Sequence, residues 1–339
     1  MHRSVGQALG SVTLAGVCLT LACGRKPHVA YRELQDHDPR VRADMATRLG
    51  EARIRGAVDS LVALLDDPHV EVRVSAIRAL GEIGDPRAVP AMIEHGSDPS
   101  VPFRTAMCRS LGQLEDPRAV PLLGRFLRDM DDRMRLAAAK ALADIPGRES
   151  ADALVGVLLR DESETIQEQA AKLLRRSDAT LVARRIQESV KSGDDRVRAN
   201  AARALGELAD RSSISFLIEA LDDPYHGVRS MAAQSLVELA PDDAAVREAL
   251  ERRMSGETQA LTQVDLAWSL ARLGNRSHVD RIRSLLFEGS PEEVRAEAAM
   301  ALGDVGDETD LARLEKALQA DASLVRREAY VAIQKLKRS

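Results

Sequence analysis

Residues 67–85 read DPHVEVRVSAIRALGEIGD, and this stretch decides the fold. An Asp-Pro break at its start is followed by apolar residues at helical spacing from Val70 to Ile83, and a Gly-Asp-Pro break ends the run. This pattern predicts a helix over residues 70–83. A shorter apolar segment covers residues 88–95 before Asp98-Pro99 starts the pattern again, so the sequence predicts a helical hairpin that repeats.

The arginine of this stretch recurs along the chain at a fixed step. Neighbours within two runs are 31 residues apart, and the runs are Arg42, Arg73, Arg104 and Arg135, then Arg198 and Arg229. A period of roughly 20 to 50 residues is typical of stacked units that each bury an apolar face against the next unit. With this arginine as position zero, the remaining units take Gln167, Leu266, Arg295 and Arg326 at that position, which gives ten units.

The composition favours closely packed helices. Hydrophobic residues make up 45% of the chain but aromatic residues only 2%, so Ala, Leu, Val and Ile must build the core. We therefore expect an all-α fold with one continuous core. The net charge is -5 with both signs interspersed, which disfavours bulk binding of nucleic acid.

The stretch over residues 67–85 resembles the HEAT repeat family, in the short form named for phycobilisome lyases. The resemblance implies a right-handed α-α superhelix, or α-solenoid, of about ten hairpins over residues 34–339. In the family, an aspartate and the arginine six residues later form hydrogen bonds that tie adjacent units together. The matching pairs are Asp36 with Arg42, Asp67 with Arg73, Asp98 with Arg104, Asp129 with Arg135 and Asp223 with Arg229. We expect this ladder to be weakest at Gln167 and Leu266, which replace the arginine.

Two further positions are nearly constant in type. Position seven is apolar in every unit: Leu49, Leu80, Leu111, Leu142, Leu174, Leu205, Leu236, Leu273, Leu302 and Ile333. Position eight is glycine in six units: Gly50, Gly81, Gly112, Gly206, Gly274 and Gly303. We expect position seven to form the core, and position eight to permit close approach of helices or an exit of the chain.

The first residues form a different kind of segment. Arg3 is the only Lys, Arg, Asp or Glu among the first 24 residues, and a Leu-Thr-Leu-Ala-Cys sequence ends at Cys23. This is typical of a secretory signal, and its end is similar to a bacterial lipobox, although Thr20 replaces the usual Leu. We predict a signal peptide over residues 1–22, palmitate on Cys23, a tether over residues 23–33 and an exported protein anchored in the cell membrane or outer membrane. An ordinary cleaved signal or an uncleaved membrane anchor is the alternative.

The sequence lacks the motifs that commonly carry catalysis. It contains no phosphate loop, G-x-G-x-x-G, H-E-x-x-H, G-x-S-x-G or C-x-x-C. The histidines are scattered singly, at His37, His69, His95, His226 and His278, so we predict no metal and no cofactor. Cys108 is expected to be a small core residue. A lyase-like enzyme subunit related to phycobilisome lyases is kept as an alternative function.

Position five of the second helix is expected to point outward, together with positions two and nine. It is basic in five consecutive units: Arg78, Arg109, Lys140, Lys172 and Arg203. An acid one turn later would pair with three of them, whereas Arg109 and Lys172 lack such an acid. We predict that Arg109, Lys172, Arg175 and Arg176 bind an acidic partner segment. One alternative is an anionic polymer bound along a concave basic stripe, and another is a salt-bridged, solvated face that binds no partner.

The period slips near the end of the chain, where Arg229 and Leu266 are 37 residues apart. In this register Trp268, the only tryptophan, occupies position two, and Met231 occupies it one unit earlier. Tryptophan often anchors interfaces, so these two residues form a second candidate site, although a large side chain could also fill an irregular unit. We predict a monomeric, non-catalytic scaffold of the bacterial cell envelope whose partner is another protein, identity unknown.

Overall fold

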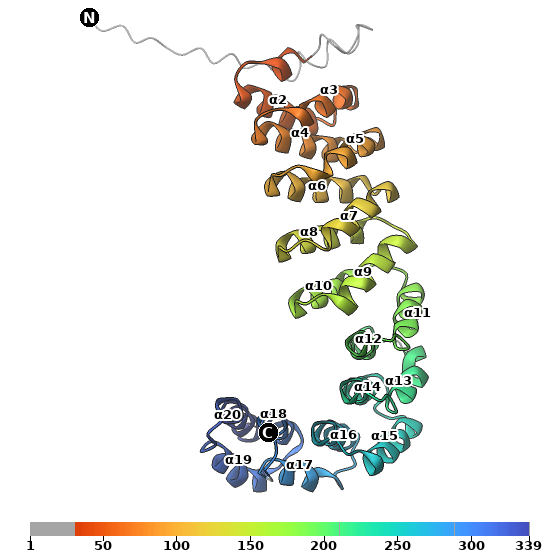
Figure 1. Ribbon diagram of the computed structural model, residues 1–339, viewed down its shortest axis with the longest axis vertical. Helices are drawn as coiled ribbons and strands as arrows, with labels where there is room; N and C mark the ends of the chain where they lie inside the picture. Colours follow the sequence, from red (N-terminus) through yellow and green to blue (C-terminus); the bar gives the residue numbers. More distant parts are fainter. Residues whose placement is uncertain (1–30, 210, 288, 339) are drawn as a thin grey trace, which may run out of the picture. The chain divides into compact units, whose positions relative to one another are not determined.

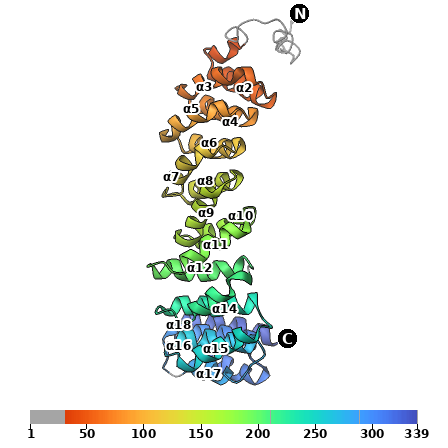
Figure 2. The same ribbon diagram turned by 90° about the vertical axis from the view of Figure 1, so that its right-hand side faces the viewer.

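All regular secondary structure in the described part of the chain is helical. The computed structural model describes residues 31–209, 211–287 and 289–338, and within them lie 19 α-helices and several short 3-10 helices but no strand. The chain divides into two units, Met1–Ser150 and Ala151–Ser339. Within each unit, successive hairpins place their first helices in one row and their second helices in another (Figure 1, Figure 2). The predicted all-α fold of stacked hairpins is confirmed.

In the first unit, the second helices are the long ones. They are α2 (Pro39–Glu51), α4 (Val70–Ile83), α6 (Val101–Leu114) and α8 (Asp132–Asp144). The first helices are α3 (Val58–Ala63), α5 (Val89–Glu94) and α7 (Val120–Phe126), extended by the 3-10 helices η3 (Arg55–Ala57), η4 (Leu64–Asp66), η5 (Pro86–Ala88), η6 (His95–Ser97) and η7 (Pro117–Ala119). The 3-10 helix η2 (Arg32–Gln35) precedes α2. The predicted helix over residues 70–83 is α4.

The second unit also consists of a row of first helices and a row of second helices. The boundary between the units falls inside α9 (Arg148–Arg160). The second helices are α10 (Glu164–Leu174), α12 (Asp195–Glu207), α14 (His226–Leu239), α16 (Ala260–Arg272), α18 (Glu292–Val305) and α20 (Ser323–Leu336). The other helices are α11 (Ala179–Ser189), η8 (Arg211–Ser213), α13 (Ile214–Ala220), α15 (Ala244–Gly256), α17 (Val279–Leu285), η9 (Glu308–Asp310) and α19 (Leu311–Ala317). Within this unit, the second helices line the inner side of the curve in Figure 1.

Aspartates and one glycine delimit the helices. The carboxylates of Asp38, Asp131 and Asp194 each accept a hydrogen bond from the backbone N–H two residues on, at 2.8 to 2.9 Å. This is N-capping, which satisfies amides that the helix itself leaves unpaired. Gly84 ends α4 with φ 71, a left-handed conformation that favours glycine. The chain breaks predicted from the sequence therefore have a local cause.

Positions seven and eight hold neighbouring second helices together. All ten residues assigned to position seven are buried, and Leu80, Leu111 and Leu302 are 0% exposed, so the core prediction is confirmed. At position eight, a Cβ on Gly50 would lie 2.7 Å from the Cα of Ala79 on the next helix. Glycine therefore permits the close approach that was expected.

The position-zero arginines form a ladder, but its connectivity differs from the expected one. Arg73 donates from Nη1 to the backbone carbonyl of Asp67 at 2.8 Å, and from Nε to the carboxylate of Asp98 at 2.9 Å. The aspartate six residues earlier thus supplies its carbonyl, and the aspartate of the following unit supplies its carboxylate. Arg42 and Arg198 make the same two kinds of contact. Arg104 donates to the carbonyl of Asp98 at 2.7 Å, and Arg229 to that of Asp223 at 2.8 Å.

The ladder carboxylates stay charged although they are largely buried. Burial alone would raise the pKa of Asp67, but hydrogen bonds from Arg42 and from the His69 backbone outweigh it and hold the pKa below its ordinary value. The same balance lowers the pKa of Glu257, whose side chain is 0% exposed beside Arg229. Removing the arginine beside a buried carboxylate of this kind strongly lowers the stability of the fold, because the charge is left buried without its partner.

The eighth unit has a different register from the one assigned by sequence. Gln263 Nε2 donates to the carbonyl of Glu257, six residues earlier, at 2.6 Å, and the Glu257 carboxylate accepts from Arg229 Nε at 2.7 Å. Gln263 is therefore position zero, and Leu266 is a fully buried core residue. The assignment to Leu266 was wrong because Glu and Gln here replace the Asp and Arg of the pattern. The correction moves Trp268 from position two to position five.

Candidate functional site

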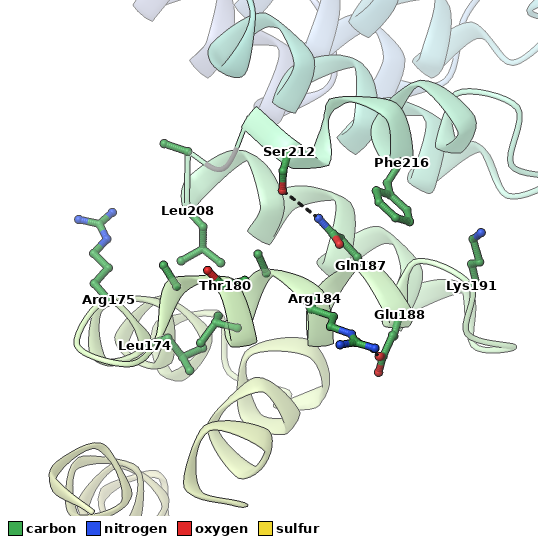
Figure 3. A pocket seen from close by; sticks show the side chains of 14 residues that line it. Leu174, Arg175, Thr180, Arg184, Gln187, Glu188, Lys191, Leu208, Ser212 and Phe216 are labelled. Carbon is green, nitrogen blue, oxygen red and sulfur yellow. Dashed lines mark hydrogen bonds and ion pairs between the residues drawn. The ribbon is translucent and has the colours of Figure 1, made fainter. Parts of the chain in front are cut away.

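A groove opens in the second unit between α11 on one side and η8 with α13 on the other (Figure 3). It encloses about 970 Å³. Its apolar walls include Leu174 at the end of α10, Val182 and Ala183 on α11, Leu208 after α12 and Phe216 on α13. We call this feature the α11–α13 groove.

The local sequence explains why the groove stays open. The residues that α11 contributes at its start are short, Ala179, Thr180 and Ala183, so they leave space beside them. On the opposite side, α12 ends at Glu207 with Leu208 as its C-cap, and Ala209 adopts a left-handed conformation with φ 55 that redirects the chain. Gln187 bridges the two sides: it donates to the hydroxyl of Ser212 at 3.4 Å, as Figure 3 shows, and to that of Ser213 at 3.0 Å.

The rim of the groove is mainly positive. Among its described lining residues are the cations Arg175, Arg184 and Lys191 and a single acid, Glu188. Arg184 lies 3.6 Å from Glu188, and the Lys191 ammonium lies 5.7 Å from the centre of the Phe216 ring. This arrangement can accept an apolar side chain in the groove and negative charge at its rim.

The structure brings together only part of the predicted basic cluster. Lys172 is exposed on α10, and Arg175 and Arg176 are exposed directly after it. Arg175 lines the α11–α13 groove, whereas Arg109 lies on α6 in the first unit. Two other nearby arginines are ion-paired: Arg184 with Glu188, and Arg185 with Asp152 at 2.6 Å.

The i, i+4 pairs predicted along position five form only in part. Arg203 binds Glu207 at 2.5 Å and also donates to the side-chain carbonyl of Gln167 at 2.6 Å. Within the described residues, Arg78 and Glu82 form no such pair. A carboxylate oxygen of Glu82 lies over Gly50 instead, 2.6 Å from where a Cβ would stand.

Met231 and Trp268 do not share a position once the register is corrected. Met231 is at position two of α14, and Trp268 at position five of α16. The Trp268 ring packs partly against the core, its Nε1 donates to Asp304 at 3.3 Å, and Arg272 lies 5.6 Å from its centre. The indole therefore fills space and also faces the surface.

Sequence reasoning missed the apolar half of the groove. Phe216 is one of only four phenylalanines, and this rarity was the available signal; that it lies half-buried beside the exposed Lys191 is seen only in the structure. The hollow itself arises because the short side chains of α11 face the backbone turn at Ala209. No residue pattern in the sequence predicts this arrangement.

Other predicted features have plain surroundings or lie outside the described residues. Cys23, the signal peptide and the start of the tether belong to the undescribed residues 1–30. Cys108 is buried, and burial raises the pKa of its thiol to about 12. His95 and His278 pair with Asp66 and Glu251, at 3.1 and 2.9 Å.

Two kinds of feature are absent from the described residues. Those residues contain no group of three or more His, Cys, Asp or Glu that could hold a metal ion. In the same part of the chain, no helix has both the length and the hydropathy needed to cross a membrane.

Comparison with known proteins identifies the repeat. The family pattern of HEAT repeats matches residues 30–105, 92–175, 182–265 and 257–334. No curated protein matches the sequence. The structure is similar to the karyopherin Kap121p bound to the extreme C-terminus of the protein phosphatase Cdc14p, with a TM-score of 0.60 and 13% identity over 91% of this chain and 41% of that chain.

Two further solved structures show weaker likeness. The complex of CpcE and CpcF of phycocyanin lyase from Nostoc sp. PCC7120 has a TM-score of 0.40 and 22% identity, over 68% of this chain and 95% of that chain. An engineered protein has a TM-score of 0.36 and 21% identity, over 92% of this chain and 99% of that chain. Because the family pattern covers nearly all of residues 30–334, the chain belongs to the HEAT repeat family.

Proposed function

We propose that this protein is a non-catalytic scaffold of the bacterial cell envelope, and that its α11–α13 groove binds an acidic segment of another protein. One observation carries the proposal: the groove has mainly apolar walls, and its described rim holds three cations and one acid. The stacked hairpins give a scaffold a long surface for partners. The single rim carboxylate, Glu188, is occupied by Arg184 and Arg185.

The groove predicts the chemistry of the bound segment. An apolar side chain would enter between Leu174 and Phe216, and acidic residues on either side of it would meet Arg175 and Lys191. Arg175 forms no ion pair within the described residues, so a carboxylate bound there would not have to displace a partner. Charges at such a rim act mainly on specificity and on the rate of association.

We further propose that Cys23 is lipidated and holds the protein at a membrane. The support is the nearly uncharged segment that ends in Ala22-Cys23. Several acyl chains would hold a protein far more firmly than one. In cells fed radioactive palmitate, the chain should be labelled, and Cys23→Ala should remove the label; label that persists in the variant contradicts the anchor and leaves the groove proposal untouched.

The polyanion alternative rests on the first unit. Arg78, Arg109 and Lys140 are exposed at position five of α4, α6 and α8. If they bound an anionic polymer, affinity would fall steeply with salt, because each neutralised charge releases a counterion. Titration of the full chain with heparin at increasing salt therefore separates this function from the groove.

Photocrosslinking in cells tests the groove. A photoreactive amino acid replacing Thr180, which lines it, should capture one discrete protein, and Arg175→Glu should weaken that capture. The same amino acid at Glu248, exposed on α15, is the matched control position, and Arg247→Glu is the matched charge control. Capture that is equal at Glu248, or that Arg175→Glu leaves unchanged, overturns the proposed function.

A further inference from the structure

The corrected register places three apolar side chains at position five of the last three second helices. They are Trp268 on α16, Met300 on α18 and Val331 on α20. Met300 is 39% exposed and Val331 is 41% exposed, while Trp268 is half-buried. We call these three residues the apolar stripe. Large apolar side chains exposed at one position of consecutive helices mark a surface that packing within the chain does not cover.

Carboxylates stand beside the apolar stripe at position two of the same helices: Asp265, Glu297 and Glu328. Asp265 accepts a hydrogen bond from Gln234 at 3.0 Å, and Glu328 pairs with the exposed Arg327 at 2.7 Å. Glu297 lies between them in the stack and has no hydrogen-bond or ion-pair partner within the described residues. Its side chain is half-buried, so it is a partly desolvated carboxyl group without a partner in the fold.

The surroundings of Glu297 disfavour its charge. Burial, followed by the negative charges of Asp265, Glu328 and Asp304, raises the pKa of Glu297 to about 7. A cation placed beside it would relieve both effects.

The cations nearby are already engaged at position nine. Lys335 binds Asp304 at 2.8 Å, and Arg272 lies 5.6 Å from the centre of the Trp268 ring. At position nine, Lys335 is therefore paired with an acid and Arg272 lies beside an aromatic ring, whereas at position two neither Glu297 nor Asp265 forms an ion pair within the described residues. The missing charge on this surface is positive.

The spacing of the helices suits an extended segment. Neighbouring packed helices lie about 8 to 10 Å apart. A segment in the extended polyproline II conformation has three residues per turn and advances about 3.1 Å per residue. Every third residue of such a segment would therefore meet the same position in consecutive units. An apolar residue at every third place would contact Trp268, Met300 and Val331, with a basic residue next to it facing Glu297.

We propose that the apolar stripe together with Glu297 binds an extended segment of a partner protein in which an apolar residue recurs at every third place, next to a lysine or arginine. Charge complementarity selects this occupant, because an acidic segment or an anionic lipid would add to the repulsion around Glu297. This surface lies on helices that the α11–α13 groove does not use, so the protein would hold two partner segments of opposite charge.

Tryptophan fluorescence of the full chain tests the proposal directly, because Trp268 is the only tryptophan. The probe is the synthetic peptide (Lys-Leu-Ser)4, and we expect a saturable change in the emission of Trp268. The peptides (Glu-Leu-Ser)4 and (Lys-Ser-Ser)4 remove the positive charge and the apolar residues in turn. Each should bind at least tenfold more weakly, and equal affinity for either one overturns the proposal.

Two glutamates on the same helix give a matched pair of variants. Glu297→Gln should weaken binding of (Lys-Leu-Ser)4 about tenfold, whereas Glu293→Gln, at an exposed position of α18, should leave it unchanged. If the two variants weaken binding equally, the peptide is held only by general electrostatic attraction, and the proposal is overturned. Glu297→Gln keeps the side-chain shape and removes a disfavoured charge, so loss of folding is not expected, and a thermal melt checks this. Arg175→Glu should leave the peptide affinity unchanged, which separates this surface from the groove.

Discussion

Position five has opposite chemistry in two regions of the molecule. In the first unit it carries the exposed cations Arg78, Arg109 and Lys140, and at the end of the second unit it carries Trp268, Met300 and Val331. Both sets lie on the second helices, at the same distance along the chain from position zero. Positions zero and seven keep their residue types in nearly all units, and position eight is glycine in about half of them, since the stacking depends on these positions. The repeat therefore constrains the residue types at the positions that pack. Position five is not constrained in this way, so it can differ between binding surfaces.

The largest effect on stability is expected from a substitution at one of the positions that hold the helices together. Arg229→Ala should lower the free energy of unfolding by roughly 3 kcal/mol, because the Glu257 side chain, 0% exposed, would lose its main cation. Arg253, 3.3 Å from Glu257, limits the loss. The exposed Arg78→Ala at position five should change stability by less than about 0.5 kcal/mol. Urea unfolding followed by circular dichroism compares them, and similar shifts in midpoint would refute the division into packing and free positions.

Position eight should respond next. Gly303→Ala should cost roughly 2 kcal/mol, because the new Cβ would stand 2.7 Å from the Cα of Ala332 and the two helices would have to separate. Gly156→Ala in α9 is the control, since a Cβ there meets nothing within 4 Å. That substitution should stabilise by about 0.5 to 1 kcal/mol through higher helix propensity. Thermal melts that move in the same direction would contradict this account of position eight.

The two regions differ in how well they could be predicted. The helix over residues 70–83, the buried position seven and the close approach at Gly50 all follow from constant residue types at a fixed period. The register failed at Gln263, where amide and glutamate groups make the same hydrogen bonds that guanidinium and aspartate make elsewhere. That error hid the apolar stripe, because it placed Trp268 at position two.

The α11–α13 groove lay beyond sequence reasoning for another reason. Arg175 was predicted as a partner contact on charge alone, but the hollow beside it depends on the backbone turn at Ala209 and on the position of Phe216, which come from different helices. A pattern within one repeat does not report how side chains of consecutive repeats meet.

The pH dependence of stability should have opposite signs at two glutamates. The pKa of Glu297 rises from 4.5 to about 7 on folding, so the folded state holds an extra proton between these values and stability falls as pH increases through them. The pKa of Glu257 is lowered, so its contribution is present above 4.5 and is lost as pH falls. Glu297→Gln should therefore raise the free energy of unfolding at pH 8 by roughly 1 to 2 kcal/mol. It should not change the loss of stability at acidic pH that Glu257 causes. The free energy of unfolding measured from pH 4 to 8 tests both effects. If it rises from pH 5 to 8 as much in the wild type as in the Glu297→Gln variant, the assignment to Glu297 is contradicted.

Substitutions at position five should change stability least and peptide binding most. Met300→Lys with Val331→Lys converts the apolar stripe to the basic type of the first unit, and both residues are about 40% exposed, so each change should alter stability by less than about 0.5 kcal/mol. The pair should nevertheless abolish binding of (Lys-Leu-Ser)4, because the new ammonium groups repel the peptide and its leucines lose their contacts. Arg109→Met with Lys140→Met, the reverse exchange in the first unit, should leave that binding unchanged. If the first pair unfolds the second unit, the stripe is a packing feature and not a free position. Intact folding together with undiminished peptide binding would show that position five does not select the partner.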